Sequence, residues 1–314
     1  MSPYPDSADE ISRVCRESGF EFTAIEKVRS RVYKATVAPQ TDSGPETKYI
    51  KLHTTSRKSE FETFAAIATS VGHPPCDVVD ADNYLCLVMD SAPGRPFSQL
   101  LPVVFLPGVW TYKQQQYVEA FQQVGRQLGR LHARTEMGHG PVLDASEQQK
   151  AVDKTAVLEG HVDHETITAI TNIFEKSSNI VTPYAITYGD RTPHNIVFDG
   201  KNVSQIDTSC KKRSTAYEHR GVVMGLTLMA RRVPYGTVSK GRRLIDAYWN
   251  GYTQENSTSG ADNAYFVRHL YGAIKLLNTY ESPQTIESKL TKWIDPPILY
   301  DEIETAIQKI TSNE

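Results

Sequence analysis

The chain has 314 residues, of which 39% are hydrophobic and 23% charged, and its formal net charge is -3. These proportions are ordinary for a globular protein, and this length predicts two lobes rather than one hydrophobic core. A nucleic-acid-binding domain would be basic, and no apolar run approaches the roughly 20 residues of a membrane span.

The first ten residues are polar and acidic, unlike a secretory signal. The four cysteines are scattered and form no C-x-x-C pair, so neither a zinc site nor a disulfide framework is expected. We therefore predict a cytoplasmic protein with no nucleic-acid partner and no membrane partner. Its oligomeric state does not follow from the sequence.

A short helix is predicted over 8–18 and strands within 22–37, and the next predicted strand, 48–52, carries Lys51. Successive side chains of a strand point to opposite faces, so Lys51 faces away from its apolar neighbours Ile50 and Leu52. Taken alone, a solvated edge lysine is the simplest interpretation. A lysine that binds nucleotide phosphates is the alternative.

A second helix is predicted over 56–72, because apolar residues recur there at three- and four-residue spacing before a glycine. Glu60 and Glu62 lie near its start. Strands are then expected over 76–79 and 84–89, and the near-continuous apolar run of the latter indicates burial on both faces.

Residues 90–94 read Asp-Ser-Ala-Pro-Gly and predict a hinge, after which the pattern becomes helical. A long amphipathic helix is predicted over 112–134. The further expected elements are two helices within 142–180 and helices over 217–232, 244–252, 263–280 and 297–310.

The segment 184–207 predicts a strand, a turn and a hairpin around Asp199-Gly200, a pair typical of two-residue type I′ turns. Folding this hairpin would bring Asn195 and Asp207 together, with Asp190 just before them. One amide oxygen and two carboxylates suit a hard cation such as Mg²⁺. A catalytic Asp, a metal-binding Asn and a metal-binding Asp in this order are typical of phosphoryl-transfer sites.

These residues resemble the aminoglycoside phosphotransferase and choline kinase-like superfamily, whose fold is related to that of protein kinases. The family motif H-G-D-x-x-x-x-N, a hairpin and I-D reads here Tyr188-Gly-Asp-Arg-Thr-Pro-His-Asn195 and then Ile206-Asp207. The lysine strand, the helix with Glu60 in its E-x-x-x-L-x-x-L position and the hinge precede it in the family order. Matching segments extend from about residue 22 to 230, and the D-F-G and A-P-E motifs of protein kinases are missing.

The resemblance implies a bilobal α+β fold of the protein kinase type. A small antiparallel sheet with one helix would form a nucleotide-binding lobe, 1–91, and a larger, mainly helical lobe, 92–314, would carry the catalytic and acceptor sites. ATP and Mg²⁺ would be the cofactors. The implied nucleotide-binding residues are Lys51, Glu60 as the partner that orients it, Ser30 of the phosphate-covering loop, and Met89, Asp90 and Ser91 of the hinge.

In the same way, Asp190 would accept the proton of a substrate hydroxyl, or orient that hydroxyl, and Asn195 and Asp207 would hold Mg²⁺. The implied activity is transfer of the γ-phosphoryl group of ATP to a hydroxyl of a small molecule. The acceptor would be an antibiotic-like natural product, as in antibiotic resistance, or a metabolite.

Three departures from the family pattern support an alternative, a nucleotide-binding pseudokinase or regulatory module. Tyr188 replaces the usual His, Arg191-Thr192 replaces the common Leu-His, and the phosphate-covering loop, 27–33, has no glycine. The intact lysine, glutamate, asparagine and aspartate positions oppose this alternative.

The sequence leaves the acceptor open. Residues 136–166 contain seven acidic side chains against two lysines, which would suit a cationic aminoglycoside. Residues 208–243 contain nine Lys and Arg against Glu218 alone. Solvated helix faces explain both segments equally well.

Overall fold

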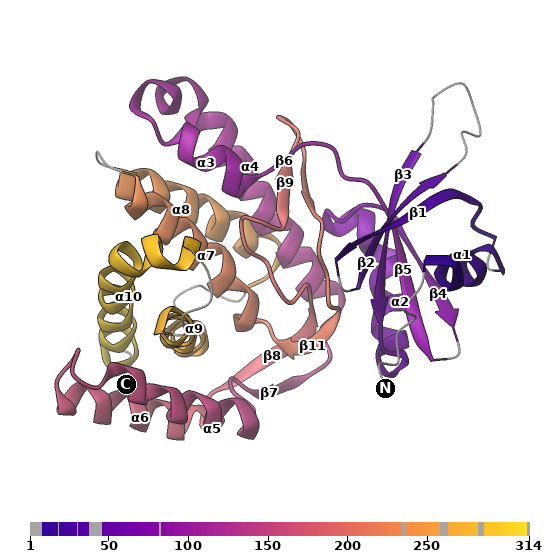
Figure 1. Cartoon of the computed structure of the whole chain (residues 1–314). Helices are drawn as coiled ribbons and strands as arrows, with labels where there is room; N and C mark the ends of the chain where they lie inside the picture. The colour runs from indigo at the N-terminus through magenta and orange to yellow at the C-terminus, as the bar shows by residue number, and fades with distance from the viewer. Residues whose placement is uncertain are drawn as a thin grey trace.

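The computed structural model describes residues 8–17, 19–29, 31–37, 46–81, 83–233, 237–257, 263–281 and 286–312. Within these ranges the chain forms a smaller lobe around a sheet and a larger lobe of helices (Figure 1). The bilobal α+β fold predicted from the sequence is therefore confirmed. We propose the division between the lobes at 91/92, where the chain leaves the sheet.

The smaller lobe contains an antiparallel sheet with the strand order β1-β2-β3-β5-β4. A helix between β3 and β4 and a further helix at the N-terminal end complete it. The elements are α1 (Ala8–Glu17), β1 (Phe22–Arg29), β2 (Val32–Val37), β3 (Glu46–His53), α2 (Lys58–Ile67), β4 (Cys76–Ala81) and β5 (Tyr84–Asp90), with the short 3-10 helix η2 (Ala68–Val71) after α2.

Strand β5 is buried on both of its faces, as its apolar run predicts. Cys86 and Val88 pack in one hydrophobic cluster with Ile11 of α1. Leu85 and Leu87 point the other way and belong to the cluster that contains the aromatic residues of α2 and extends into the larger lobe. The sheet is thus a layer between α1 and the rest of the protein.

The larger lobe consists of helices and two three-stranded sheets, ordered β10-β9-β6 and β11-β8-β7. Its helices are α3 (Phe97–Val104), α4 (Pro107–Arg134), α5 (Ala145–Lys154), α6 (His164–Lys176), α7 (Ala216–Arg232), α8 (Thr237–Glu255), α9 (Asn263–Glu281) and α10 (Ile286–Ser312). Its strands are β6 (Arg95–Pro96), β7 (His139–Pro141), β8 (Val181–Thr187), β9 (Ile196–Phe198), β10 (Val203–Gln205) and β11 (Lys211–Ser214). Among the described helices, none combines the length and apolarity that a membrane span requires.

The turn between β9 and β10 differs from the two-residue turn that Asp199-Gly200 predicts. Val203 pairs with Phe198, so four residues form the loop. The Asp199 carboxylate accepts hydrogen bonds from the backbone N–H groups of Lys201 at 2.7 Å and Asn202 at 2.6 Å. A type I′ turn needs positive φ at both central residues, whereas here only Gly200 has it. The Asp side chain therefore stabilises a longer turn of its own.

Helices α4 and α8 cross in close contact at two glycines, one on each helix. A Cβ atom at Gly125 of α4 would overlap the backbone carbonyl oxygen of Tyr248, and one at Gly251 of α8 would overlap that of Gln122. Backbone atoms cannot rotate away as the end of a side chain can, so the absence of a Cβ sets the separation of the two helices.

We expect Gly125→Ala to destabilise the protein by about 1–3 kcal/mol or more, because the helices must separate to accommodate the methyl group. The matched control is Gly108→Ala on the same helix, where a Cβ meets no atom within 4 Å. Urea unfolding would give both free energies. Equal stability of the two variants would contradict the close crossing.

Candidate active site

Two nested antiparallel strand pairs bring the predicted site residues together. The outer pair joins β8 to β11, with Thr187 opposite Lys211, and the inner pair joins β9 to β10. Backbone bonds continue between the pairs: the Ser209 N–H donates to the Tyr188 carbonyl at 2.6 Å and the Ile206 N–H to the Asn195 carbonyl at 3.0 Å. The loop 188–195 and the segment 206–210 are thereby held side by side.

Gly189 makes the turn into this loop possible. Its φ is +97°, a left-handed conformation, and a Cβ atom there would overlap the Ser209 side chain. An L-residue with a side chain would be strained on both grounds. The glycine before Asp190 is therefore required by the backbone.

Asp190 and Asn195 form one hydrogen-bonded unit. The Asn195 side-chain amide donates to the Asp190 carbonyl at 2.9 Å and to its carboxylate at 3.1 Å. This bonding leaves the amide oxygen of Asn195 available as an acceptor. Burial in the cleft and the nearby Asp207 carboxylate raise the pKa of Asp190 above its ordinary value, although Arg220 opposes the shift.

Lys51 of β3 reaches across from the smaller lobe to Asp207. Its ammonium forms an ion pair with the Asp207 carboxylate and donates to the Thr208 carbonyl at 2.9 Å. Because Asp207 also acts on the pKa of Asp190, the lysine and both carboxylates share one electrostatic environment. The edge-lysine interpretation is wrong, since Lys51 faces the site.

The expected ion pair between Lys51 and Glu60 is not formed in this structure. Within the described residues, the Lys51 ammonium is satisfied by Asp207 and Thr208 instead. Glu60 lies in the first turn of α2, half-buried, and accepts a hydrogen bond from the Ser59 hydroxyl at 3.1 Å. Glu60 lies on the expected helix, but Lys51 pairs with the carboxylate of Asp207 instead.

The predicted adenine-binding residues lie at the end of β5. Met89 is buried in the core, and the Asp90 carboxylate pairs with Lys48 of β3. The Ser91 N–H donates to the Thr47 carbonyl at 3.2 Å. Ser30 lies outside the described residues. The contacts of Met89, Asp90, Ser91 and Ser30 with a nucleotide therefore stay a prediction.

The oxygen atoms at this site fit a hard divalent cation. Asp207 offers a carboxylate, Asn195 an amide oxygen and Asp190 a second carboxylate, and such ligands suit Mg²⁺. Nowhere among the described residues do three or more His, Cys, Asp or Glu side chains form a group that could hold a metal ion, so the candidate set here is two carboxylates and one amide.

Tyr188, which replaces the family's usual His, is buried and connects the two lobes; we call it a strut for this reason. It is 1% exposed, and its hydroxyl donates to the Val71 carbonyl of η2 at 2.6 Å. Its ring packs edge-on against Phe64 of α2, with 5.6 Å between ring centroids. Burial raises the pKa of Tyr188, so the phenol stays a neutral donor.

Arg191, the second departure, is also buried and acts together with Tyr188. Its guanidinium lies 4.6 Å from the Tyr188 ring centroid and donates to the Val124 carbonyl of α4 at 2.9 Å. A guanidinium over an aromatic ring is stabilised because the face of the ring carries partial negative charge. The loop is thus attached to both lobes by two residues whose importance the sequence signals only as deviations.

Glu218 of α7, which belongs to no sequence motif of the predicted site, supports the loop that carries Asp190. It is 1% exposed, and its carboxylate accepts the Gly189 N–H at 2.6 Å. His132 of α4, also buried, lies 3.5 Å from its other oxygen. The signal in the sequence was that Glu218 is the lone acid of the basic segment 208–243, and in the fold its carboxylate holds the backbone of the loop 188–195.

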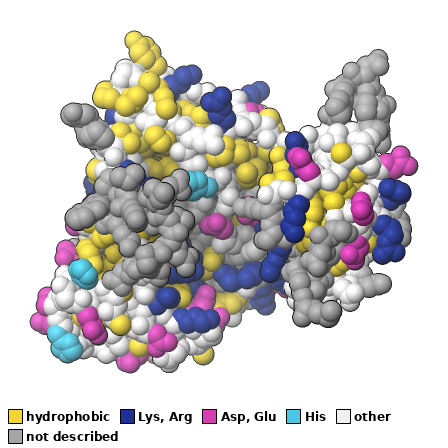
Figure 2. Space-filling model, in the orientation of Figure 1, with side chains coloured by type: hydrophobic (Ala, Val, Ile, Leu, Met, Phe, Trp, Pro, Cys, Tyr) yellow, Lys and Arg dark blue, Asp and Glu magenta, His cyan; other side chains and the backbone are white. Residues whose placement is uncertain are grey.

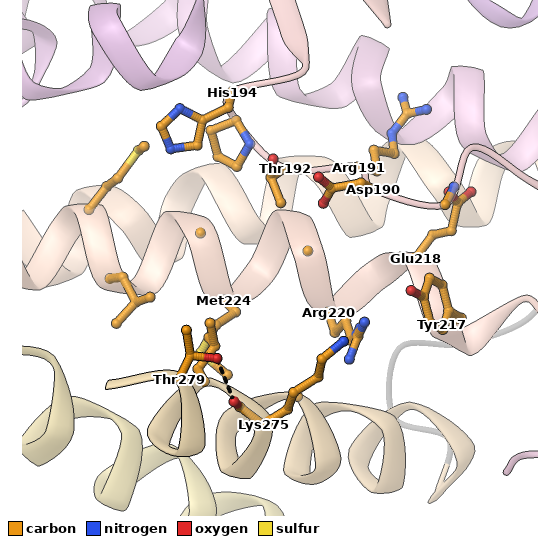
Figure 3. A pocket seen from close by; sticks show the side chains of 18 of the residues that line it. Asp190, Arg191, Thr192, His194, Tyr217, Glu218, Arg220, Met224, Lys275 and Thr279 are labelled. Carbon is orange, nitrogen blue, oxygen red and sulfur yellow. Dashed lines mark hydrogen bonds between the residues drawn. The ribbon is translucent and has the colours of Figure 1, made fainter. Parts of the chain in front are cut away.

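A cavity of about 320 Å³ opens beside Asp190. Figure 3 shows the loop 189–194 above it, with α7 and α9 forming its other walls. Apolar side chains line part of it, and Arg220 and Lys275 project into the space below Asp190. A small molecule in this cavity would have Asp190 at one end.

No protein-family model and no curated protein sequence matches the chain. Solved structures do match it. A glucosamine kinase in complex with glucosamine, ADP and inorganic phosphate aligns with a TM-score of 0.61 at 10% identity, over 96% of this chain and 83% of that chain. The chain has the protein kinase-like fold of that enzyme. A choline/ethanolamine kinase family protein from Mesorhizobium loti aligns with a TM-score of 0.52 at 11% identity, over 96% of this chain and 97% of that chain.

These similarities confirm the fold predicted from the resemblance, because nearly the whole chain follows the path of both kinases. The protein kinase-like fold includes the last eighty residues, whose sequence indicates only helices. Identities of 10% and 11% carry no information about the acceptor.

We expect Tyr188→Phe to lower the free energy of unfolding by about 1–3 kcal/mol, because the buried Val71 carbonyl loses the hydroxyl that donates to it. Tyr184→Phe is the control: its hydroxyl bonds the Pro141 carbonyl at 2.8 Å in a half-buried position that water can reach. Urea titrations would compare the two. A Tyr188→Phe variant as stable as wild type would contradict the role of Tyr188 as a strut.

Proposed function

We propose that the chain is an ATP- and Mg²⁺-dependent phosphotransferase that acts on a hydroxyl group of a small molecule. The observation that carries the proposal is the convergence of Lys51, Asp190, Asn195 and Asp207 where the two lobes meet, beside a cavity that opens onto Asp190. The glucosamine kinase with the same fold was solved with ADP, which supports a nucleotide between the lobes.

In the proposed reaction, Asp190 orients the acceptor hydroxyl and takes its proton. A bond forms between the hydroxyl oxygen and the γ-phosphorus, the bond from that phosphorus to the bridging oxygen of the β-phosphate breaks, and ADP leaves. Phosphoryl transfer proceeds through a loose transition state, so positioning and charge stabilisation dominate catalysis.

The other residues would bind and position Mg²⁺ and ATP. Asn195 and Asp207 would hold Mg²⁺, which when bound neutralises charge on the phosphates. Lys51 would bind the phosphates of ATP, in exchange for its ion pair with Asp207. Residues Met89, Asp90 and Ser91 would contact the adenine, Ser30 would cover the phosphates, and Glu60 would orient Lys51 once Asp207 binds the cation.

Asp190→Asn tests this proposal with little change of shape. We expect the turnover number to fall at least about 100-fold, in the range for loss of a general base, while ADP binding measured by calorimetry stays unchanged. The control is Asp199→Asn, which makes the same chemical change in the exposed turn of the neighbouring hairpin.

Turnover would be followed by mass spectrometry, as the gain of one phosphoryl group on hydroxyl-bearing metabolites and antibiotics. Activity of Asp190→Asn within a few-fold of wild type would contradict the assignment. ADP binding without any product from the wild-type protein would instead favour a nucleotide-binding regulatory module.

The pH dependence of kcat/KM provides a separate test. Asp190 accepts a proton only when ionised, so the rate falls as pH falls through its pKa, which burial and Asp207 raise above the ordinary value of about 3.9. Arg220 lowers this pKa, so Arg220→Met should move the acid limb of the profile to higher pH. An unmoved limb, or one that moves to lower pH, would contradict the assignment.

A further inference from the structure

The cavity beside Asp190 carries more positive charge than its own carboxylates balance. Arg220 of α7 and Lys275 of α9 line it, and Figure 3 shows their side chains pointing toward one another below Asp190. Among the described residues, neither forms an ion pair with a carboxylate. Two cations that face each other in one cavity repel unless an anion lies between them.

The other charged residues of the cavity wall are already engaged, and Arg191 is buried against the Tyr188 ring. Arg232 forms a two-point pair with Asp295, in which Nε lies 2.8 Å from the carboxylate. Glu218 is buried beneath the catalytic loop and accepts the Gly189 N–H. Asp190 remains as the reacting carboxylate. Arg220 and Lys275 are therefore the charges available to a ligand.

Further cations gather around Tyr217, which lines the same cavity. The guanidinium carbons of Arg213 and Arg220 lie 4.3 and 4.4 Å from its ring centroid, and that of Arg268 lies at 5.4 Å. Burial alone would raise the pKa of Tyr217, yet Arg220, Arg213 and Lys275 together lower it below its ordinary value. The positive potential thus extends into the wall of the cavity.

Arg268 adds a desolvated charge to this cluster. It is 1% exposed, and one of its nitrogens pairs with Glu147 at 2.7 Å. Its Nε and Nη1 atoms have no hydrogen-bond partner within the described part of the chain. Burying a guanidinium with two unpaired nitrogens costs free energy.

The acidic segment that would suit a cationic acceptor is not part of this cavity. Of its seven acidic residues, none lines the cavity, and Glu147 is paired with Arg268. The remaining six are exposed to solvent: Glu136, Asp144, Asp153, Glu159, Asp163 and Glu165. Lys and Arg side chains, by contrast, gather in the hollow between the lobes (Figure 2).

We propose that the acceptor is a hydroxyl-bearing anion, with a carboxylate or phosphate group held between Arg220 and Lys275 while its hydroxyl faces Asp190. The inference rests on the proposed phosphotransferase function. An arginine fork and a lysine ammonium are the groups that proteins use for such anions. The apolar part of the wall, Met224, Leu228, Met229 and Leu276, would contact the carbon skeleton. A cationic aminoglycoside or quaternary amine would be repelled.

Four small probes of matched size test this charge preference by NMR titration: D-glycerate, glycerol 3-phosphate, glycerol and choline. The protein is saturated with Mg²⁺-ADP, so that the nucleotide phosphates do not compete. We expect the two anions to bind at least 10-fold more tightly than glycerol and choline. The stronger of the two anions distinguishes a carboxylate acceptor from a phosphate acceptor.

Substitutions of Lys275 test whether the anions bind in this cavity. Lys275→Met should weaken both anions at least 10-fold, and Lys275→Arg should restore them. Lys275→Glu should reverse the preference toward choline. Lys212→Met is the control, because Lys212 is an exposed lysine of the basic segment 208–243 that does not line the cavity. Tighter binding of choline than of D-glycerate by wild type, or an equal effect of Lys212→Met and Lys275→Met, would overturn the inference.

The same probes separate this inference from the proposed function. Lys275-dependent anion binding without phosphoryl transfer to any acceptor tried would refute the phosphotransferase and leave the anion site standing. Transfer of phosphate to choline, with none to the anions, would refute the anionic acceptor and leave the phosphotransferase standing. Unfolding midpoints of all variants verify that each is folded.

Discussion

The site depends on two antiparallel strand pairs nested inside one another. The β8–β11 pair and the β9–β10 pair hold the loop 188–195 against the segment 206–210 through backbone hydrogen bonds. This places two carboxylates, Asp190 and Asp207, close enough to raise the pKa of Asp190. Like charges at this separation repel, so the backbone ladder, the bond from Asn195 and the ion pair with Lys51 must offset the repulsion. A metal ion bound there would do the same.

Two of the three departures from the family pattern, Tyr188 and Arg191, have a physical explanation in the structure. A histidine at position 188 would be shorter than tyrosine, whose hydroxyl reaches the Val71 carbonyl in the other lobe. Arg191 stacks on the same ring and bonds α4. The two residues thus attach the loop 188–195 to both lobes at once. They look like degeneration in the sequence and act as supports in the structure, which weakens the argument for a pseudokinase.

Charged side chains are paired differently at the junction of the lobes and in the cavity beside Asp190. Between the lobes, Lys51 is paired to Asp207. In the cavity beside Asp190, Arg220 and Lys275 have no such carboxylate partner among the described residues. Solved kinases of this fold include enzymes named for glucosamine and for choline or ethanolamine, which are amines. The anionic acceptor that we propose would be a different chemistry on the same fold.

The sequence by itself determined the order of elements, the lysine strand, the hinge and the triad of Asp190, Asn195 and Asp207, because these follow from local periodicity and motif spacing. It did not determine the four-residue turn after Phe198, the partner of Lys51 or the role of Glu218. Each of these depends on which groups meet in space: Asp199 bonds its own loop, Asp207 is nearer to Lys51 than Glu60 is, and α7 places Glu218 under Gly189. Charge counts along the chain did not separate an acceptor site from solvated helix faces in either the acidic or the basic segment. Only the tertiary structure shows which charges line the cavity beside Asp190, because burial and pairing, rather than composition, determine which charges face it.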